Sequence, residues 1–360
     1  MYEYSTGRKR LASYQRSVAL SAILMFIGIG TLIFAKHPAL RSLAAVTIIG
    51  MFTVVLMAYY LPPLVFRWLT RGVRTADPSS LISHLSSPLP ITLGRFCRSL
   101  FAIVFFLLMM YLFMLPFTWL YFRFGKNSEE KKLRYHRLLQ RVSDFVIHHV
   151  PGVQFALQNR VGETFENPAV VICNHQSHLD LMCLMMLTPK IVFLTNDWVW
   201  HNPFYGMVIH RAEFYPVSDG IEAHLEQLRS LYQRGYSICI FPEGTRSPDG
   251  SILRFHKGAF YLAEQLHADI LPIFLHGAGH VLPKKDFMLR QGWIDVEVQE
   301  RIPWDDPRFS TDLLTRTKQI RAYYRNHYSE MCERIETEEY LAPYRRYIEK
   351  YMTLTDQESR

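Results

Sequence analysis

The chain has 360 residues, of which 49% are apolar and 20% charged, and its formal net charge is +8. This composition excludes a disordered chain, a collagen-like chain and a small disulfide scaffold. Residues 1–124 hold 12 Lys and Arg but 2 acids, hence +10, and the remainder carries −2. A basic, apolar front before a nearly neutral back is typical of a membrane segment followed by a globular domain. It argues against a nucleic-acid partner, because that partner needs a basic folded domain.

Three stretches of the front part lack any charged side chain, namely Val18–Ala35, Leu43–Phe66 and Leu100–Phe122. At about 1.5 Å per residue, a helix over any of these stretches is long enough to cross the hydrocarbon core of a bilayer. Seven residues join the first two stretches, so residues 1–70 are predicted to form an antiparallel transmembrane hairpin. Arg and Lys are more numerous at its outer ends than in its loop, which places both ends in the cytoplasm.

The third apolar stretch conflicts with that orientation. Residues 71–124 are interpreted as a linker followed by this membrane-embedded helix, and six Arg and Lys follow it between Arg123 and Arg137. If the helix crossed the bilayer, these cations would lie outside. We therefore expect Leu100–Phe122, interrupted by Pro116, to dip into the bilayer or lie shallow. That interpretation predicts a protein integral to the inner (cytoplasmic) membrane with its globular domain facing the cytoplasm; the alternative is three ordinary spans and an external domain.

The hairpin sequence also resembles part of a membrane protein family. The run from Ile27 to Ser42, followed by Ile49-Gly50 and Leu61-Pro-Pro-Leu64, is similar to the last two helices of RND/MMPL-type exporters. The remaining helices and external domains of an exporter have no counterpart in the sequence. The resemblance therefore implies a membrane anchor or a fusion remnant and not a working pump.

Cysteine usage bears on the compartment. The five cysteines are odd in number and show no Cys-x-x-Cys spacing. We expect reduced thiols that face a reducing compartment.

Residues 125–305 have the pattern of an α/β domain. Short apolar runs, typical of buried strands, are separated by segments of helix length and cover residues 169–173, 191–194, 236–241 and 270–275. This alternation predicts a largely parallel sheet flanked by helices. Helical periodicity is clearest over residues 221–232 and 258–266. A C-terminal tail, residues 306–360, is predicted to be helical between Ser310 and Met352.

A base, a hydroxyl and a carboxylate follow the first of these strands, in the block Asn174-His175-Gln176-Ser177-His178-Leu179-Asp180. On an ideal helix, residues five apart point about 140° apart, so His175 and Asp180 meet only if His175 lies in the turn before the helix. Asp180 could then fix the imidazole tautomer and stabilise the imidazolium. Considered alone, a His near an Asp in a chain with 15 His is more often surface or core packing.

A second block, Phe241-Pro242-Glu243-Gly244-Thr245-Arg246-Ser247, ends the third strand run. A Pro-Glu-Gly turn at a strand end exposes backbone N–H groups and presents a carboxylate and an Arg from one loop. This arrangement suits the binding of an anionic group. Considered alone, it is equally well explained as a polar turn with Arg246 in solvent.

Together the two blocks resemble the glycerolipid acyltransferase family of 1-acylglycerol-3-phosphate acyltransferase-like proteins. Residues 174–180 match the family's N-H-x-S-x-x-D block, and residues 241–247 match its F-P-E-G-T-R-S block at every position. Their order and spacing also agree, and Leu271-Pro272-Ile273 matches a later apolar-Pro block. The resemblance covers residues 130 to 300 and implies an acyltransferase domain.

The resemblance implies a role for each matched residue. His175 would be the general base and Asp180 would orient it. The other implied positions are Glu243, Gly244, Thr245, Arg246, Ser247 and Lys257 for substrate binding, and Asn174, Ser177 and Pro272 for support. The implied reaction moves a fatty acyl chain to the free hydroxyl of a lysophospholipid at the lipid bilayer, foremost 1-acylglycerol-3-phosphate, giving phosphatidic acid. Acyl-CoA or acyl carrier protein is the implied donor, with no metal and no bound cofactor.

One feature of the family is missing. Between the two blocks the family usually has an Arg shortly after a Phe-containing apolar run, but residues 212–218 contain none. Arg211 lies just upstream and is the candidate substitute for this phosphate contact. The acceptor could otherwise be a single-chain lipid that has a free hydroxyl and no phosphate.

Two rival interpretations use only part of the sequence. His175, His178 and Asp180 could bind a metal ion in a metal-dependent lipid hydrolase, which leaves residues 241–247 unused. A non-enzymatic exporter fragment with a lipid-sensing domain explains the hairpin but not the His175 and Asp180 pair. Ser177 is not expected to be a nucleophile, because its turn lacks the G-x-S-x-G elbow.

Overall fold

The structure is a computed structural model that describes residues 46–48, 50, 93–202, 205–217, 220–284 and 288–342. The chain divides into two units, residues 1–78 with 353–360 and residues 79–352. Residues 46–48 and 50 are helical. The rest of the exporter-like hairpin, the linker before residue 93 and the tail beyond residue 342 lie outside the described residues.

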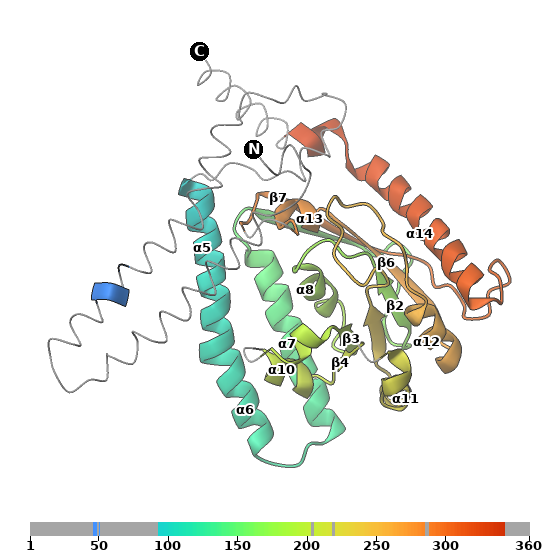
Figure 1. Ribbon diagram of the computed structural model, residues 1–360, viewed down its shortest axis with the longest axis horizontal. Helices are drawn as coiled ribbons and strands as arrows, with labels where there is room; N and C mark the ends of the chain where they lie inside the picture. The colour runs from blue at the N-terminus through green and yellow to red at the C-terminus, as the bar shows by residue number, and fades with distance from the viewer. Residues whose placement is uncertain are drawn as a thin grey trace. The chain divides into compact units, whose positions relative to one another are not determined.

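A seven-stranded sheet forms the centre of this unit, in the order β1-β7-β6-β2-β5-β3-β4 (Figure 1). Its strands are β1 (Val153–Gln158), β2 (Val170–Cys173), β3 (Ile191–Thr195), β4 (Tyr215–Pro216), β5 (Ser237–Ile240), β6 (Ile270–His276) and β7 (Gly292–Val298). Strands β2 to β6 are mutually parallel, whereas β7 is antiparallel to β6 and parallel to β1. The predicted α/β fold with a largely parallel sheet is confirmed, and each of the four predicted runs overlaps a strand.

The strands that the sequence predicted are those covered on both faces. Every residue of β2, β3, β5 and β6 is buried, which is why these strands read as continuous apolar runs. The other three strands were not predicted. β1 is a partly exposed edge strand and β4 has only two residues. β7 alternates apolar and acidic side chains because Ile294, Val296 and Val298 face the core, while Glu297 pairs with Arg334.

Helices cover both faces of the sheet. One group comprises α7 (Glu129–His149), α8 (Asp180–Met185) and α10 (Gly206–Arg211), and the other α11 (Leu225–Gln233), α12 (Gly258–Leu266) and α14 (Leu313–Ile335) (Figure 1). Short helices α9 (Asp197–Trp200), η3 (Ile221–His224) and α13 (Ala278–Val281) lie in the connections. The helices predicted over residues 221–232 and 258–266 are confirmed by η3 with α11 and by α12. The predicted tail helix is confirmed over α14.

The third apolar stretch forms one helical rod that consists of α5 (Leu93–Leu108), the π-helical η2 (Met109–Met114) and α6 (Leu115–Arg123). The interruption expected at Pro116 takes the form of this π-helical turn and not of a break, because wider hydrogen-bond spacing accommodates a residue that has no N–H to donate. Arg95 donates to the carbonyl oxygen of Met288 at 3.1 Å, which fastens the start of α5 to the globular part.

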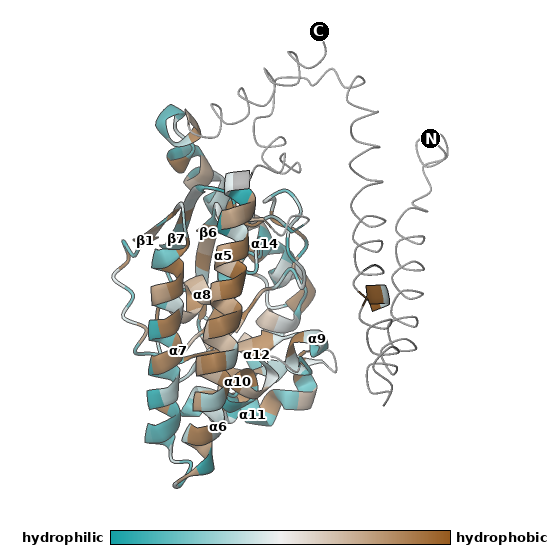
Figure 2. Cartoon of the chain, turned by 90° about the vertical axis from the view of Figure 1, so that its left-hand side faces the viewer, coloured by the Kyte–Doolittle hydropathy of each residue, from teal (hydrophilic) through white to brown (hydrophobic). Residues whose placement is uncertain are grey.

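Most of α5 is coloured as hydrophobic in Figure 2. Among the described residues, Gly94–Arg123 is the one helix whose length and composition allow it to cross a membrane. Its large side chains are exposed, with Leu112 at 73%, Phe101 at 61% and Trp119 at 57%. Whether the rod crosses the bilayer or lies shallow stays a prediction.

Candidate functional site

The two sequence blocks leave the sheet at the same edge. β2 and β5 are neighbouring parallel strands, so the segments that follow Cys173 and Ile240 emerge side by side at the carboxyl ends of the strands. The backbone N–H of Ser247 donates to the carbonyl oxygen of His175 at 2.6 Å. This bond joins the second block directly to the first.

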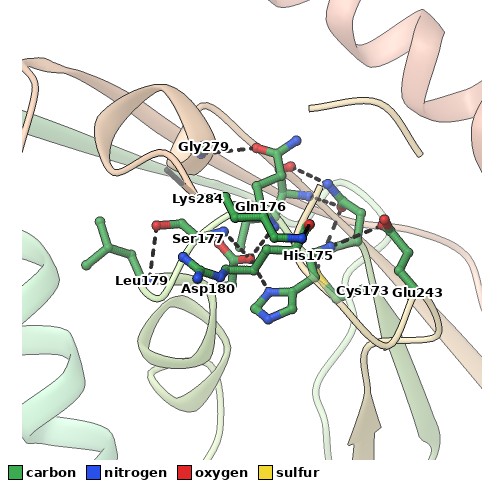
Figure 3. Close-up of polar contacts among 12 residues, drawn as sticks. Cys173, His175, Gln176, Ser177, Leu179, Asp180, Glu243, Gly279 and Lys284 are labelled. Carbon is green, nitrogen blue, oxygen red and sulfur yellow. Dashed lines mark hydrogen bonds and ion pairs between the residues drawn. The ribbon is translucent and has the colours of Figure 1, made fainter. Parts of the chain in front are cut away.

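His175 and Asp180 meet in the turn between β2 and α8 (Figure 3). Nδ1 of His175 lies 2.7 Å from Oδ2 of Asp180. The same oxygen accepts the backbone N–H groups of Gln176 at 2.6 Å and Ser177 at 2.8 Å. Asp180 is the first residue of α8 and is fully buried. Its carboxylate therefore both stabilises the turn and orients the imidazole.

The remaining faces of the imidazole are also defined. The His175 ring stacks on Phe241 of the second block, with centroids 4.2 Å apart and an interplanar angle of 19°. Its side chain is 22% exposed. Because Asp180 occupies Nδ1 and Phe241 covers one face, Nε2 is the nitrogen that remains for a substrate.

Two of the residues expected to support the dyad, Asn174 and Ser177, bind backbone groups of neighbouring segments. Nδ2 of Asn174 donates to the Leu275 carbonyl at 2.8 Å, and Oδ1 of Asn174 accepts the Leu275 N–H at 2.9 Å. Oγ of Ser177 donates to the Leu282 carbonyl at 2.9 Å, which leaves this hydroxyl in a structural role. Pro272 of β6 lies in register with β2. Asn174 and Ser177 therefore fix the turn from both sides.

Helix α14 supplies two buried tyrosines that the sequence reasoning missed. Oη of Tyr324 accepts the Asn174 N–H at 2.8 Å and lies 2.9 Å from Asn174 Oδ1. Oη of Tyr328 accepts from Nε2 of Gln176 at 2.6 Å. Ile320, Tyr324, Tyr328 and Met331 are buried at helical spacing along α14. That periodicity could have identified the buried face, although not its contact with the turn.

Glu243, in the second block, links the two blocks through a hydrogen bond to the backbone of His175. Its Oε1 accepts the His175 N–H at 3.2 Å and its Oε2 accepts the Leu253 N–H at 3.1 Å. Glu243 is 3% exposed, and burial raises its pKa to about 7. Both oxygens thus bind the protein's own backbone, and a contact of Glu243 with substrate stays a prediction.

Gly244 and Ser247 also serve the shape of the turn. Gly244 has a φ of +65°, and a Cβ there would lie 3.3 Å from the His256 ring, so a side chain would be both strained and crowded. Ser247 is buried, and its Oγ donates to Oδ1 of Asp249 at 3.1 Å. These contacts give both residues structural roles in the turn, and substrate contacts stay predictions for them.

Thr245 and Arg246 form the outward part of the turn. Thr245 is exposed and Arg246 is half-buried. Burial lowers the pKa of Arg246, and the negative charge of Asp180 opposes this shift. A cation that the sequence reasoning missed joins them, because Nζ of Lys284 donates to Oγ1 of Thr245 at 2.9 Å and to the Arg246 carbonyl at 2.7 Å.

The structure gives the two remaining candidates other contacts. Lys257 is exposed at the start of α12, where its carbonyl accepts the N–H groups of Phe260 and Tyr261. The guanidinium of Arg211 lies 5.2 Å from the centroid of the Phe122 ring in α6. Roles in substrate binding stay predictions for both residues.

The rival metal site is not assembled among the described residues. His178 is exposed, and the His175, His178 and Asp180 side chains do not form a group of potential ligand atoms within 4.8 Å of one another. Across the described ranges, the group of three potential ligands whose atoms lie within 4.8 Å of one another is His276, Cys332 and Glu336. All five cysteines are free thiols, as predicted.

Known proteins are similar to part of this chain in sequence and in fold. A family model described as Acyltransferase matches residues 152–276, which contain both blocks. A 1-acyl-sn-glycerol-3-phosphate acyltransferase from Cocos nucifera is 32% identical over 171 residues, covering 44% of this chain and 55% of that protein. A 1-acyl-sn-glycerol-3-phosphate acyltransferase beta from Homo sapiens is 27% identical over 159 residues, covering 42% and 57%. The chain thus spans about half the length of these curated relatives.

One solved structure supports the fold. The crystal structure of the 1-acyl-sn-glycerophosphate (LPA) acyltransferase PlsC from Thermotoga maritima matches with a TM-score of 0.57 and 19% identity. The match covers 68% of this chain and 98% of that one. At this identity the likeness concerns the fold alone.

Proposed function

We propose that this chain transfers a fatty acyl chain from an acyl thioester to a lysophospholipid. The match of residues 152–276 to the acyltransferase family model and the similarity to curated relatives support this proposal. The acceptor in this proposal is 1-acylglycerol-3-phosphate and the product is phosphatidic acid. The donor is acyl-CoA or acyl carrier protein. The observation that carries the proposal is the contact between His175 and Asp180 beside the turn that holds Arg246.

In the proposed reaction, His175 acts as the general base. Nε2 removes the proton of the acceptor hydroxyl while the hydroxyl oxygen attacks the thioester carbonyl carbon. Asp180, bonded to Nδ1, holds the tautomer in which Nε2 is an acceptor and stabilises the imidazolium. When the C–S bond breaks, the imidazolium returns the proton to the leaving thiolate. The new ester and the free thiol thus form without a covalent bond to the protein.

The proposal places the reaction at a lipid surface. Acceptor and product are both membrane lipids, and the rod of α5, η2 and α6 exposes a continuous apolar face. Residues 1–124 carry a charge of +10, which attracts anionic headgroups. We assign the protein to the inner (cytoplasmic) membrane, with the catalytic edge of the sheet facing the cytoplasm.

The test uses the full chain in membranes or detergent, with labelled acyl-CoA or acyl carrier protein and a panel of acceptors. The expected result is labelled phosphatidic acid from 1-acylglycerol-3-phosphate, and a loss of about 10²- to 10⁴-fold in His175→Ala. A monoacylglycerol in the panel tests the alternative acceptor without phosphate, which the missing Arg in residues 212–218 suggests. Transfer to no lysolipid, or full activity in His175→Ala, would contradict the proposal.

A further inference from the structure

Lys284 lies in a segment that contacts both sequence blocks (Figure 3). It follows α13, beyond the residues 152–276 that match the family. Two residues earlier, the carbonyl of Leu282 accepts from Oγ of Ser177 at 2.9 Å. Nζ of Lys284 then donates to Oγ1 of Thr245 at 2.9 Å and to the Arg246 carbonyl at 2.7 Å. The ammonium group is therefore held at the outward part of the turn.

The hydrogen-bond capacity of these groups is only partly used. A Lys ammonium has three N–H donors, of which Thr245 and Arg246 receive two, so one remains. Oγ1 of Thr245 accepts from Lys284, which leaves its own O–H as a donor. Among the described residues, neither Lys284 nor the Arg246 guanidinium pairs with a carboxylate. The turn thus offers a hydroxyl and two cations to an anion.

We infer that Lys284 adds a second cation to the phosphate subsite that the family resemblance implies at Thr245 and Arg246, and that this subsite binds a phosphomonoester acceptor. The inference rests on the proposed function and names its acceptor class. A phosphomonoester presents three terminal oxygens and close to two negative charges, which suit one hydroxyl group and two cationic side chains. Lys284 thereby provides the cation that residues 212–218 lack.

Acyl-CoA also carries phosphate groups, so the experiment must separate the acceptor from the donor. Three variants of the full chain are compared with the wild type: Lys284→Ala, Lys284→Arg and the control Lys190→Ala. Lys190 directly precedes β3. It therefore lies at the amino ends of the parallel strands, whereas the two blocks follow their carboxyl ends. The measured quantities are kcat/KM for 1-acylglycerol-3-phosphate, kcat/KM for monoacylglycerol, and KM for acyl-CoA.

Lys284→Ala is expected to lower kcat/KM for 1-acylglycerol-3-phosphate by about 10- to 100-fold, the range for one lost hydrogen bond to a charged group. Its kcat/KM for monoacylglycerol and its KM for acyl-CoA should stay at the wild-type level. Lys284→Arg should restore most of the loss, and Lys190→Ala should behave as wild type. An equal loss with both acceptors would mean that Lys284 only holds the turn, and a change confined to acyl-CoA would assign Lys284 to the donor; either result overturns the inference.

A binding measurement keeps the inference testable if the proposed transfer itself fails. Calorimetric titration of the wild-type full chain with glycerol 3-phosphate should show binding that Lys284→Ala weakens by at least 10-fold. Failure of catalysis together with this pattern would reject the proposed function and keep the subsite. Absent binding, or equal binding by both proteins, would reject the subsite.

Discussion

Oδ2 of Asp180 lies 2.7 Å from Nδ1 of His175, and the same oxygen accepts the N–H groups of Gln176 and Ser177. Its second oxygen, Oδ1, is buried and has no hydrogen-bond partner among the described residues. All of the recorded hydrogen bonds to the carboxylate thus converge on the oxygen that faces the imidazole. The turn and the dyad therefore both depend on Oδ2. A substitution that keeps this oxygen but removes the negative charge can distinguish the two contributions of Asp180.

Asp180→Asn is expected to separate these two contributions. The Asn oxygen can keep the hydrogen bonds of Oδ2, and the amide group takes the place of Oδ1, where an unpaired buried donor costs about 1–3 kcal/mol of stability. Turnover should fall by about 10²- to 10⁴-fold, because a neutral amide cannot stabilise the imidazolium. Acyl transfer rates and thermal midpoints of Asp180→Asn and His175→Ala measure both effects. Near-wild-type turnover in Asp180→Asn would remove Asp180 from the mechanism.

Tyr324→Phe is expected to slow acyl transfer, although Tyr324 acts only through the backbone next to His175. Tyr324 is fully buried, and its hydroxyl accepts the Asn174 N–H one residue before His175. Removing the hydroxyl leaves that buried N–H unpaired, at a cost of about 1–3 kcal/mol, and loosens the turn. We expect kcat to fall while the acceptor KM changes little, measured by acyl transfer at a temperature where the variant is folded.

The matched control for this prediction is Tyr323→Phe, on the same helix and half-exposed. It should retain wild-type kcat and thermal midpoint. If Tyr324→Phe equals Tyr323→Phe in both measurements, α14 does not position the catalytic turn.

The parts of the site that could be predicted from the sequence are the two blocks, because each lies in a short segment directly after an apolar run. The apolar runs before Asn174 and Phe241 predicted buried parallel strands, and parallel neighbours bring their carboxyl ends to one edge. Helix α14 and Lys284 could not be placed in this way. Their contacts join residues 38 to 152 positions apart, and no local pattern indicates which distant turn a helix will pack against.

Glu243 shows a second limit of sequence reasoning. A Glu in an anion-binding turn reads as a substrate contact, yet its buried oxygens accept the N–H groups of His175 and Leu253. Backbone donors of neighbouring loops leave no signal in the sequence, although each must find an acceptor when buried. The sequence thus drew attention to Glu243 but did not indicate which backbone groups its carboxylate binds.

The pair of His276 and Glu336 predicts a dependence of stability on pH. Nε2 of His276 lies 2.8 Å from Oε1 of Glu336. Burial opposes protonation, but hydrogen bonds with Cys332 and Glu336 outweigh it and raise the pKa of His276 to about 9. Because the folded pKa lies above the unfolded value of about 6.5, the stabilisation is complete below about pH 6.5 and is lost as pH rises through about 9.

Glu336→Gln should therefore destabilise the protein by about 1–3 kcal/mol at pH 6, and the difference from wild type should shrink towards pH 10. Other groups near His276, namely Cys332, Tyr340, Asp295 and His280, are common to both proteins. Urea unfolding at pH 6, 7.5 and 9.5 measures the difference, with exposed Glu333→Gln as control. A difference that does not vary with pH would show that His276 is neutral in the folded state.

The apolar rod predicts a measurable depth in the bilayer. Its exposed side chains include Phe101, Leu112 and Trp119. Phe101 and Trp119 are 18 positions apart, about 27 Å along a helix, so a crossing rod would place them near opposite surfaces with Leu112 deepest. A shallow rod, which the cations after Arg123 favour, would hold all three at similar depth near the headgroups.

Single Cys variants at these positions, labelled with a polarity-sensitive fluorophore in the full chain and reconstituted in vesicles, distinguish the two cases. The exposed native Cys97 is first replaced by Ser, and Leu314→Cys on α14, 59% exposed, is the aqueous control. We expect all three rod labels to report an apolar environment of similar depth. A maximum at Leu112 would show that the rod crosses the bilayer, and labels as water-exposed as Leu314 would show that another part of the chain contacts the lipid.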